Sequence, residues 1–419
     1  MNDRILIVGG GIAGLTLALA LNARGFRSLT ILERSSSLEQ TGSGINLLPL
    51  ATRELADLGL LAALEPLSVQ LARLNYTTWD GHLIWSEPKG RSAGFAWPQL
   101  SISRSRLHAT LLRTVIERCG ESALVGGTSV AAIRRLPQDV LAVDTNNREF
   151  AADLIVGADG IRSAVRQVLF PDLAPLRIAP STVYRGSFWG DGFLDNKSMY
   201  IAGDGLCKFV VYPMAVDTST SRTLINWAAA MPDPSPSHHA LGNWNVRVSA
   251  HELAGHFANW SLDGLRPEQV IRDSGTVYAY PMVDIDPLPA WSNGEDTVLI
   301  GDAAHGMRPI GSNGATQSIV DAVALAQALA ILRSRSAAIA EFERDRMTAV
   351  QAIQRANREQ GPEVVVDIAA QRRRSRRTAP LEVAFPYEER LGIASSYAQL
   401  TSVTQSIVNR DSQYRWSST

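Results

Sequence analysis

The sequence contains very little cysteine: Cys119 and Cys207 are the only two among 419 residues. Two thiols cannot build a disulfide framework, so we expect free thiols in a reducing compartment, the cytoplasm. An excess of either charge is also missing, because 40 Lys and Arg residues face 41 Asp and Glu residues. Proteins that bind nucleic acid or anionic membranes need a basic excess to neutralise phosphate, so we expect neither partner.

Long apolar runs are nearly absent as well. Residues 5–23 form the one candidate, but four glycines between residues 9 and 14 interrupt it, and such a cluster weakens a membrane-spanning helix. Asp3 stands where a signal peptide needs positive charge. The composition, 45% hydrophobic and 19% charged, is typical of a chain that buries a large core. We therefore expect a globular protein without a membrane span.

Metal-binding spacing is missing too. His251 and His256 are five residues apart, so on a helix they diverge by about 140° and share no face. His238 and His239 belong to a proline-rich stretch that indicates an exposed connection. We interpret the basic run at residues 372–377 as a solvated helical face. No metal site is expected.

What is present begins with a nucleotide-binding pattern. Residues 4–8 are a β-branched and aliphatic run typical of a strand buried on both faces. A glycine cluster follows, then a stretch rich in helix formers at residues 15–23, and then a second apolar run at residues 29–33 that ends in an acid. This order within about 30 residues predicts a βαβ unit that binds a dinucleotide.

The glycine spacing explains how this unit would hold its ligand. Gly9 permits a sharp turn, Gly11 lets the backbone approach a pyrophosphate, and Gly14 brings helix and strand together. The N–H groups at the start of the helix would face the phosphates. Glu33 is expected to bind the ribose hydroxyls. The pattern alone leaves NAD and FAD as alternatives.

Two segments far from the N-terminus share one pattern, an apolar strand followed by an aspartate. Residues 152–158 form an apolar strand that leads into Asp159, and residues 296–301 form another that leads into Asp302. A carboxylate at the carboxyl end of a buried strand lies where open α/β sheets bind their ligands. Both acids are therefore candidates for contact with sugar hydroxyls.

The three segments together resemble the single-component, FAD-dependent aromatic hydroxylases of the para-hydroxybenzoate and salicylate hydroxylase type, in the same order across most of the chain. The resemblance implies FAD as cofactor. It implies that Asp302 binds the ribityl chain, that Asp159 organises the pyrophosphate region, and that Arg104, or Arg106 as the alternative, contacts the ribityl and phosphate region. The residues assigned to FAD are Gly9, Gly11, Ile12, Ala13, Gly14, Glu33, Arg34, Gly44, Arg104, Asp159, Asp302, Pro309, Gly311, Gly314 and Ala315.

Further stretches suggest a subfamily. Residues 42–49, 85–88, 280–291 and 313–315 are similar to the phenazine-hydroxylating branch, the 5-methylphenazine-1-carboxylate monooxygenases. This likeness leaves the aromatic substrate open.

The resemblance also implies a reaction. A reduced flavin would form a C4a-hydroperoxide with O₂ and pass one oxygen atom to an electron-rich ring, with the hydride supplied by NADH or NADPH. Gly311 and Gly314 precede an apolar helix whose positive N-terminal end would favour the anionic reduced ring. Alternatively, these glycines only start that helix. His305 is expected either to approach flavin or substrate, or to be a hydrogen-bonded structural residue.

We expect the segment between residues 178 and 275 to form the substrate side of the site, because aromatic residues alternate along its predicted strands. Tyr and Trp at strand spacing can also simply fill a half-buried face. No residue stands out as a general base, and Lys208 stands where some relatives have a histidine. The candidates for the substrate pocket are Tyr184, Tyr212, Asn226, Trp227 and Pro309.

The expected fold class is α/β, a Rossmann-like FAD-binding domain with an inserted β-sheet substrate domain and a helical C-terminal segment. A flavin halogenase shares this fold, but its Trp-x-Trp-x-Ile-Pro string is absent. A non-catalytic flavin-binding scaffold, or another flavin oxidoreductase of the same fold, stays an alternative, and the chain is expected to be a monomer or a homodimer. The expected domain limits are 1–72, 98–177 and 276–360 for FAD, 73–97 and 178–275 for substrate, and 361–419 for the helical segment.

Overall fold

A computed structural model describes most of the chain. The described residues are 3–36, 43–137, 139–233, 246–375 and 380–415. His238, His239, Gly42 and the last two residues of the basic run at 372–377 lie outside these ranges.

The first apolar run becomes the central strand of a five-stranded parallel sheet. β1 (Ile5–Val8) pairs with β12 (Leu154–Gly157) on one side and with β2 (Leu29–Leu32) on the other. β19 (Thr297–Leu299) and β8 (Leu124–Val125) complete the two edges. Every residue of β1 is buried, as expected for a strand with helices on both faces of its sheet. The strands predicted around residues 4–8, 29–33, 152–158 and 296–301 are thereby confirmed.

Helices with buried apolar residues cover this sheet. α1 (Ile12–Ala23) packs against both α10 (Asn313–Ile331) and α4 (Arg104–Cys119), and α11 (Arg335–Arg358) packs on α10. α10 is long and apolar enough to cross a membrane, but 72% of its apolar window is buried inside the protein. It therefore serves as a core helix in this fold.

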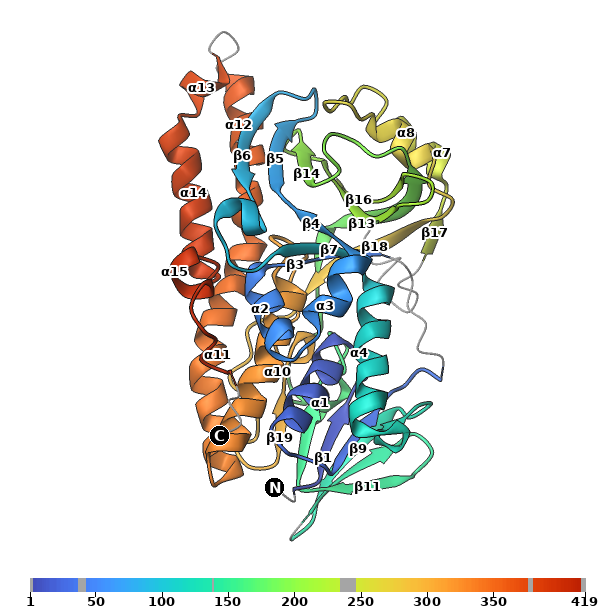
Figure 1. Ribbon diagram of the computed structural model, residues 1–419, viewed down its shortest axis with the longest axis vertical. Helices are drawn as coiled ribbons and strands as arrows, with labels where there is room; N and C mark the ends of the chain where they lie inside the picture. Colours follow the sequence, from blue (N-terminus) through green and yellow to red (C-terminus); the bar gives the residue numbers. More distant parts are fainter. Residues whose placement is uncertain (1–2, 37–42, 138, 234–245, 376–379, 416–419) are drawn as a thin grey trace.

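A second, eight-stranded sheet stands above the first in Figure 1. Its order is β17-β18-β13-β16-β15-β14-β5-β6, and every neighbouring pair is antiparallel except β14 with β5. The strands are β5 (Arg73–Thr78), β6 (Leu83–Pro88), β13 (Arg177–Gly190), β14 (Ser198–Gly203), β15 (Lys208–Asp217), β16 (Arg222–Pro232), β17 (Val246–Val248) and β18 (Val277–Asp284).

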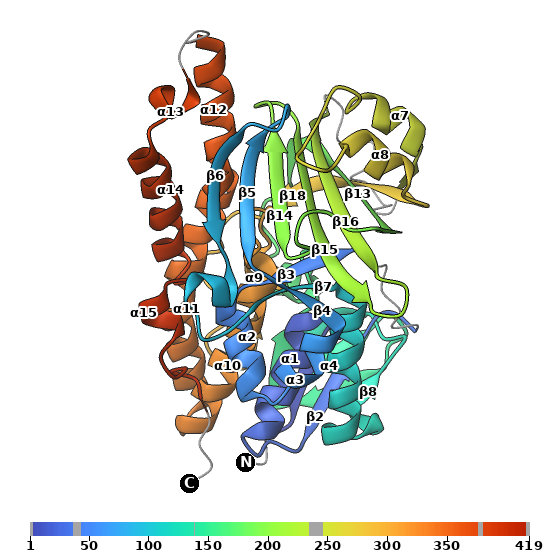
Figure 2. The same cartoon turned by 45° about the horizontal axis from the view of Figure 1, so that its top comes forward.

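The two faces of this sheet pack against different helices. On one face, Phe209 and Trp227 belong to a core cluster with α7 (Ala250–Gly255) and α8 (Pro267–Arg272). On the other face, Tyr212 and Met214 belong to a cluster with α12 (Val364–Ser375). Figure 2 shows the sheet between these two groups of helices. Side chains alternate between the faces of a strand, so β14 and β15 each contribute buried residues to both clusters.

Smaller elements join the two sheets. A three-stranded antiparallel sheet, β3-β7-β4, lies between them in Figure 2. Another, β11-β10-β9, lies beside the parallel sheet in Figure 1. The strands are β3 (Gly44–Leu47), β4 (Ser68–Leu71), β7 (Gln99–Ser103), β9 (Val130–Arg135), β10 (Val140–Asp144) and β11 (Glu149–Ala152). The remaining helices before residue 310 are α2 (Pro49–Asp57), α3 (Leu61–Leu64), η1 (Glu65–Leu67), η2 (Gly90–Ala93), η3 (Glu121–Ala123), α5 (Ala164–Leu169) and α9 (Asp302–His305).

The C-terminal segment is helical, as expected, and runs back along the whole molecule. After α11 the chain turns through η4 (Gly361–Glu363), and α12 packs on β5 and β14. α13 (Leu381–Ala384), α14 (Tyr387–Leu400) and α15 (Gln405–Val408) follow, with α14 against α11 and α15 against α2. This segment therefore contacts the eight-stranded sheet and also α2 and α11, two helices that pack against α10. It can contribute to a site between the two sheets.

Candidate active site

A cavity of about 1080 Å³ opens at the carboxyl ends of the parallel strands and continues along the α12-facing side of the eight-stranded sheet. Pockets for one small molecule usually measure roughly 300–1,000 Å³. The cavity lies just above this range, so its volume suits a large ligand. Its lining comes from the start of α1, from β3, from residues 307–315, from the large sheet and from the C-terminal helices.

Two helix N-termini face this cavity. α1 begins after Gly11, which provides no side-chain cap, and its first turn holds no acid. α10 begins after Ser312, again without a side-chain cap or an acid in the first turn. Because the first N–H groups of a helix have no partner within it and carry the positive end of the dipole, both ends favour an anionic ligand.

Two glycines of the Gly9-x-Gly11-x-x-Gly14 pattern lie where a side chain would clash with the backbone. Gly9 has φ +111°, and a Cβ there would lie 2.4 Å from the carbonyl oxygen of Ala158. A Cβ on Gly14 would lie 2.0 Å from the carbonyl oxygen of Gly9. Gly11 differs, because no protein atom lies within 4 Å of its ideal Cβ and it lines the cavity. The first two positions hold the βαβ turn together, and the third leaves open space for a ligand.

Glu33 supports that turn. One carboxylate oxygen accepts the backbone N–H of Gly10 at 2.8 Å, and the other accepts the N–H of Ser35 at 2.8 Å. The ring nitrogen Nε2 of His108 lies 2.7 Å from the carbonyl oxygen of Gly10. Glu33 does not line the cavity, and Arg34 beside it is exposed. Their contact with a ribose stays a prediction.

The two acids after the later strands lie in different surroundings. Asp159 accepts the hydroxyl of Ser163 at 2.5 Å and the N–H of Ala164 at 2.7 Å, so it caps α5, and burial raises its pKa. Asp302 lines the cavity at the start of α9. Arg166 donates to the carbonyl oxygen of Ala303 at 3.0 Å and ties the two segments together. Asp302 can thus offer its carboxylate to a ligand, whereas Asp159 shapes the backbone beside it.

A buried charge cluster holds the turn that carries Asp302. Asp321 of α10 accepts the N–H of Gly301 at 3.0 Å, Nε2 of His305 at 2.5 Å and Nε of Arg346 at 3.0 Å. Burial alone would raise the pKa of Asp321, but the facing charges of His305 and Arg346 hold it below its usual value. His305 does not line the cavity. Of its two expected roles, the geometry supports the structural one.

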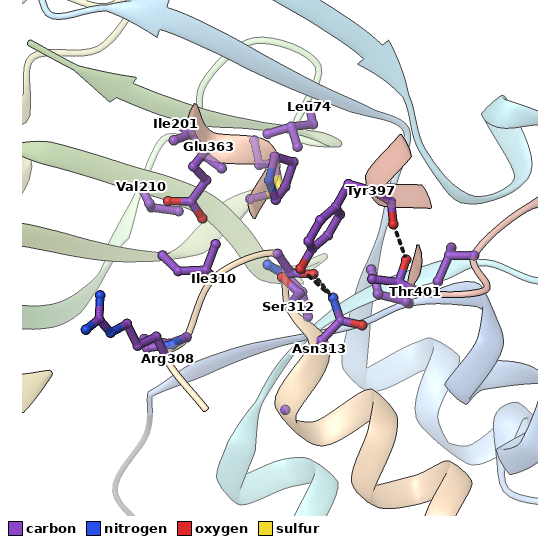
Figure 3. A pocket seen from close by; sticks show the side chains of 18 of the residues that line it. Leu74, Ile201, Val210, Arg308, Ile310, Ser312, Asn313, Glu363, Tyr397 and Thr401 are labelled. Carbon is purple, nitrogen blue, oxygen red and sulfur yellow. Dashed lines mark hydrogen bonds between the residues drawn. The ribbon is translucent and has the colours of Figure 1, made fainter. Parts of the chain in front are cut away.

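The turn before α10 has a strained backbone, and a side chain of the C-terminal segment is hydrogen-bonded to it. Ser312 lies in the left-handed region with φ +59°, which non-glycine residues rarely adopt. Asn313 donates to the carbonyl oxygen of Gly311 at 3.0 Å and to the hydroxyl of Tyr397 at 2.9 Å. That hydroxyl donates in turn to Asn357 at 2.7 Å. Figure 3 shows Tyr397 of α14 reaching this turn at the cavity wall.

Comparisons with known proteins identify the chain. The signature of the FAD binding domain family matches residues 3–174 and 289–357, more than half of the chain. The chain belongs to the FAD binding domain family. Phenazine 1,6-dicarboxylic acid hydroxylase PhzS of Lysobacter antibioticus is 37% identical over 371 residues, which are 83% of this chain and 91% of that protein. Salicylate hydroxylase of Pseudomonas putida is 28% identical over 363 residues, 81% of this chain and 80% of that protein.

The fold agrees with this assignment. HpxO of Klebsiella pneumoniae, solved in complex with FAD and uric acid, superposes with a TM-score of 0.70 at 20% identity, over 97% of this chain and 95% of that one. The chain is therefore an FAD-dependent monooxygenase of the aromatic hydroxylase type, with an α/β fold, and FAD is its cofactor.

The cavity of this flavoprotein fits FAD. Its walls combine two uncapped helix N-termini for a pyrophosphate and an anionic ring, the carboxylate of Asp302 for hydroxyls, and the cation Arg104 at the start of α4. Glycines at the approach points keep side chains out of the way. The expected FAD residues that line the cavity are Gly11, Ile12, Ala13, Gly44, Arg104, Asp302, Pro309, Gly311, Gly314 and Ala315.

The substrate candidates separate by strand face. Tyr212 lines the cavity, and burial raises its pKa to about 12. Asn226 lies behind it and accepts the N–H of Gly44 at 2.8 Å. Trp227 is the next residue along β16 and points the other way, donating to Ser274 at 2.7 Å within the cluster of α7 and α8. Tyr184 packs against that same cluster and does not line the cavity. These two aromatics therefore fill the far face, while Tyr212 and Pro309 remain candidates.

Several polar residues of the cavity wall were not expected from the sequence. Tyr397 and Glu363 come from the C-terminal segment, where no motif marks them. The Gln-Gly-Pro string at residues 360–362 is a turn signal, and it is what returns the chain toward the cavity. Among the described residues, no group of three or more His, Cys, Asp or Glu side chains could hold a metal ion. Among the unexpected polar residues that line the cavity are Tyr76, Arg185, Arg308, Glu363 and Tyr397.

Replacing Gly311 tests whether the turn before α10 tolerates a side chain. Gly311→Ala is expected to lower the free energy of unfolding by roughly 1–3 kcal/mol more than Gly127→Ala, because of overpacking. Both glycines have similar backbone angles, φ +63° and +64°, but a Cβ on Gly311 would lie 2.3 Å from the Tyr397 hydroxyl, and one on Gly127 would meet nothing within 4 Å. Urea unfolding of the two variants measures the difference, and equal losses would contradict the clash.

Proposed function

We propose that this flavoprotein hydroxylates an electron-rich aromatic or heteroaromatic small molecule in the cytoplasm, consuming O₂ and NADH or NADPH. Bound FAD, once reduced by the nicotinamide, would activate O₂ and deliver one oxygen atom to the ring. A fused heteroaromatic such as a phenazine is the favoured substrate class, because the relative from Lysobacter antibioticus is named for a phenazine substrate and matches most of the chain.

The observation that carries the proposal is the mixed character of one cavity. At the start of α10 it offers uncapped backbone N–H groups, while its inner part is walled by the apolar side chains of Leu74, Ile201, Val210 and Ile310 (Figure 3). A flat aromatic molecule fits such walls, which exclude water from the reacting atoms. The domain limits given above and the FAD contacts of individual residues belong to the same proposal.

Spectra and nicotinamide oxidation test it. The purified protein is expected to be yellow and to oxidise NADH or NADPH slowly until an aromatic substrate binds. The bound substrate is needed to exclude water from the reacting atoms. Phenazine-1-carboxylate, 1-hydroxyphenazine and salicylate would be compared, with product and peroxide measured in each case. A yellow protein that no aromatic molecule stimulates would favour the alternative, a flavin-binding scaffold without turnover.

A further inference from the structure

The inner part of the cavity holds one deeply buried carboxyl. Glu363 ends η4, is 5% exposed and lines the cavity. Figure 3 shows its carboxyl pointing into the space near Val210 and Ile310. A charged group among apolar side chains is costly unless it is paired or has a use, so its partners decide what it can do.

The partners of Glu363 leave room for one more hydrogen bond. Nζ of Lys208 lies 3.7 Å from the carboxylate, beyond hydrogen-bond range, and donates instead to Gln360 at 2.7 Å. The backbone N–H of Gly311 also faces the carboxylate and lowers its pKa. Asp367 lies 3.6 Å from Lys208 on its more exposed side. Because a carboxylate can accept about four hydrogen bonds, Glu363 can still accept a donor that enters from the cavity.

Apart from Asp367, which is more exposed than Glu363, the other titratable groups that face Glu363 are poor proton acceptors. Burial raises the pKa of Tyr76 well above its usual value, and it raises that of Tyr397 too, so both phenols stay neutral donors. Arg308 directs its guanidinium to Asp284 at 2.9 Å. Burial also raises the pKa of Glu363, while Lys208 opposes the rise. A carboxyl titrating nearer to neutral pH is better suited to accept a proton there.

We propose that Glu363 accepts the proton of a hydroxyl or ring N–H group on the aromatic substrate, with Lys208 compensating the charge. The inference rests on the proposed hydroxylation and narrows its substrate class to rings that carry such a donor. The substrate's O–H or N–H bond breaks and a new O–H bond forms on Glu363. The electron pair stays on the substrate and delocalises into the ring, which becomes a better acceptor of the oxygen atom. The proton moves between two groups in the same cavity, so the net charge of the cavity is unchanged, and Nζ of Lys208 stays 3.7 Å from the carboxyl that receives the proton.

The test compares Glu363→Gln with Glu359→Gln, the same substitution at an exposed position four residues earlier, at the end of α11. The probes are 1-hydroxyphenazine, which can lose a proton, and 1-methoxyphenazine, which cannot. The wild type and Glu359→Gln are expected to bind 1-hydroxyphenazine with the absorption spectrum of its anion, below the pH at which the free compound ionises. Glu363→Gln should bind the neutral form and hydroxylate it about 10²–10⁴-fold more slowly, while all three proteins bind 1-methoxyphenazine alike.

An unchanged spectrum and turnover in Glu363→Gln would overturn the inference and leave the proposed function intact. If no aromatic molecule stimulates the wild type, the proposed function fails, and the role of Glu363 fails with it. Glu363→Asp guards against misfolding of the first variant, because it keeps a carboxyl of the same charge. It should still bind the anion, and binding of only the neutral form by Glu363→Asp, with 1-methoxyphenazine affinity retained, would also count against the inference.

Discussion

Asp302→Ala is expected to purify nearly colourless. Asp302 lines the cavity at the carboxyl end of β19, where its carboxylate can accept hydrogen bonds from the hydroxyls of FAD. Hydrogen bonds to a charged group contribute about 1.5–3 kcal/mol each, so losing the carboxylate should weaken FAD binding by about 100-fold. The ratio of flavin to protein absorbance after purification measures this loss, and fluorescence titration of the flavin-free protein gives the dissociation constant.

Two further variants make the Asp302 result specific. Asp302→Asn keeps the shape and one acceptor oxygen, so its FAD affinity should lie between those of the wild type and Asp302→Ala. Asp296→Asn changes an acid at the opposite end of the same strand. Asp296 does not line the cavity and forms an ion pair with Arg135 at 2.8 Å. This variant should stay yellow. Full retention of flavin by Asp302→Ala would remove Asp302 from the cofactor site.

The sequence predicted the parts of the fold that local signals determine. β1 is buried along its whole length, so its residues had to be apolar, and Gly9 and Gly14 occupy positions where a Cβ would meet backbone atoms within 2.4 Å and 2.0 Å. Such constraints leave a visible pattern in the sequence. The cavity-lining place of Asp302 follows from the same strand-end rule.

The far part of the site could not be predicted because tertiary packing determines it. Asn226 and Trp227 are both buried on opposite faces of β16, and when both faces of a strand are covered, alternation does not tell which one meets the cavity. Glu363 and Tyr397 belong to a segment whose only visible property was helix formation. Their place depends on how α12 and α14 pack against the large sheet and α11, which no local pattern encodes.

Asp321→Ala is expected to lower the free energy of unfolding by about 3–5 kcal/mol at pH 7, because removing one partner of a buried ion pair leaves the other charge uncompensated. Arg346 and His305 both bond to Asp321, and the cluster is buried. Glu341→Gln on α11 is the control, since its pair with Arg344 is exposed and should contribute less than about 1 kcal/mol. Urea unfolding measures both variants.

The pH dependence separates a lost charge from a lost shape. The pKa of folded Asp321 is below its usual value, so the ionised group stabilises the fold above about pH 4, the range of an unfolded aspartate, and this contribution is lost as the pH falls through the folded pKa. The difference between the wild type and Asp321→Asn should therefore shrink below about pH 4. A difference that is constant with pH would show that packing alone is responsible. The N–H of Gly301, next to Asp302, also bonds to Asp321, so Asp321→Ala should lose flavin together with stability. Asp302→Ala, in contrast, should lose flavin and unfold like the flavin-free wild type.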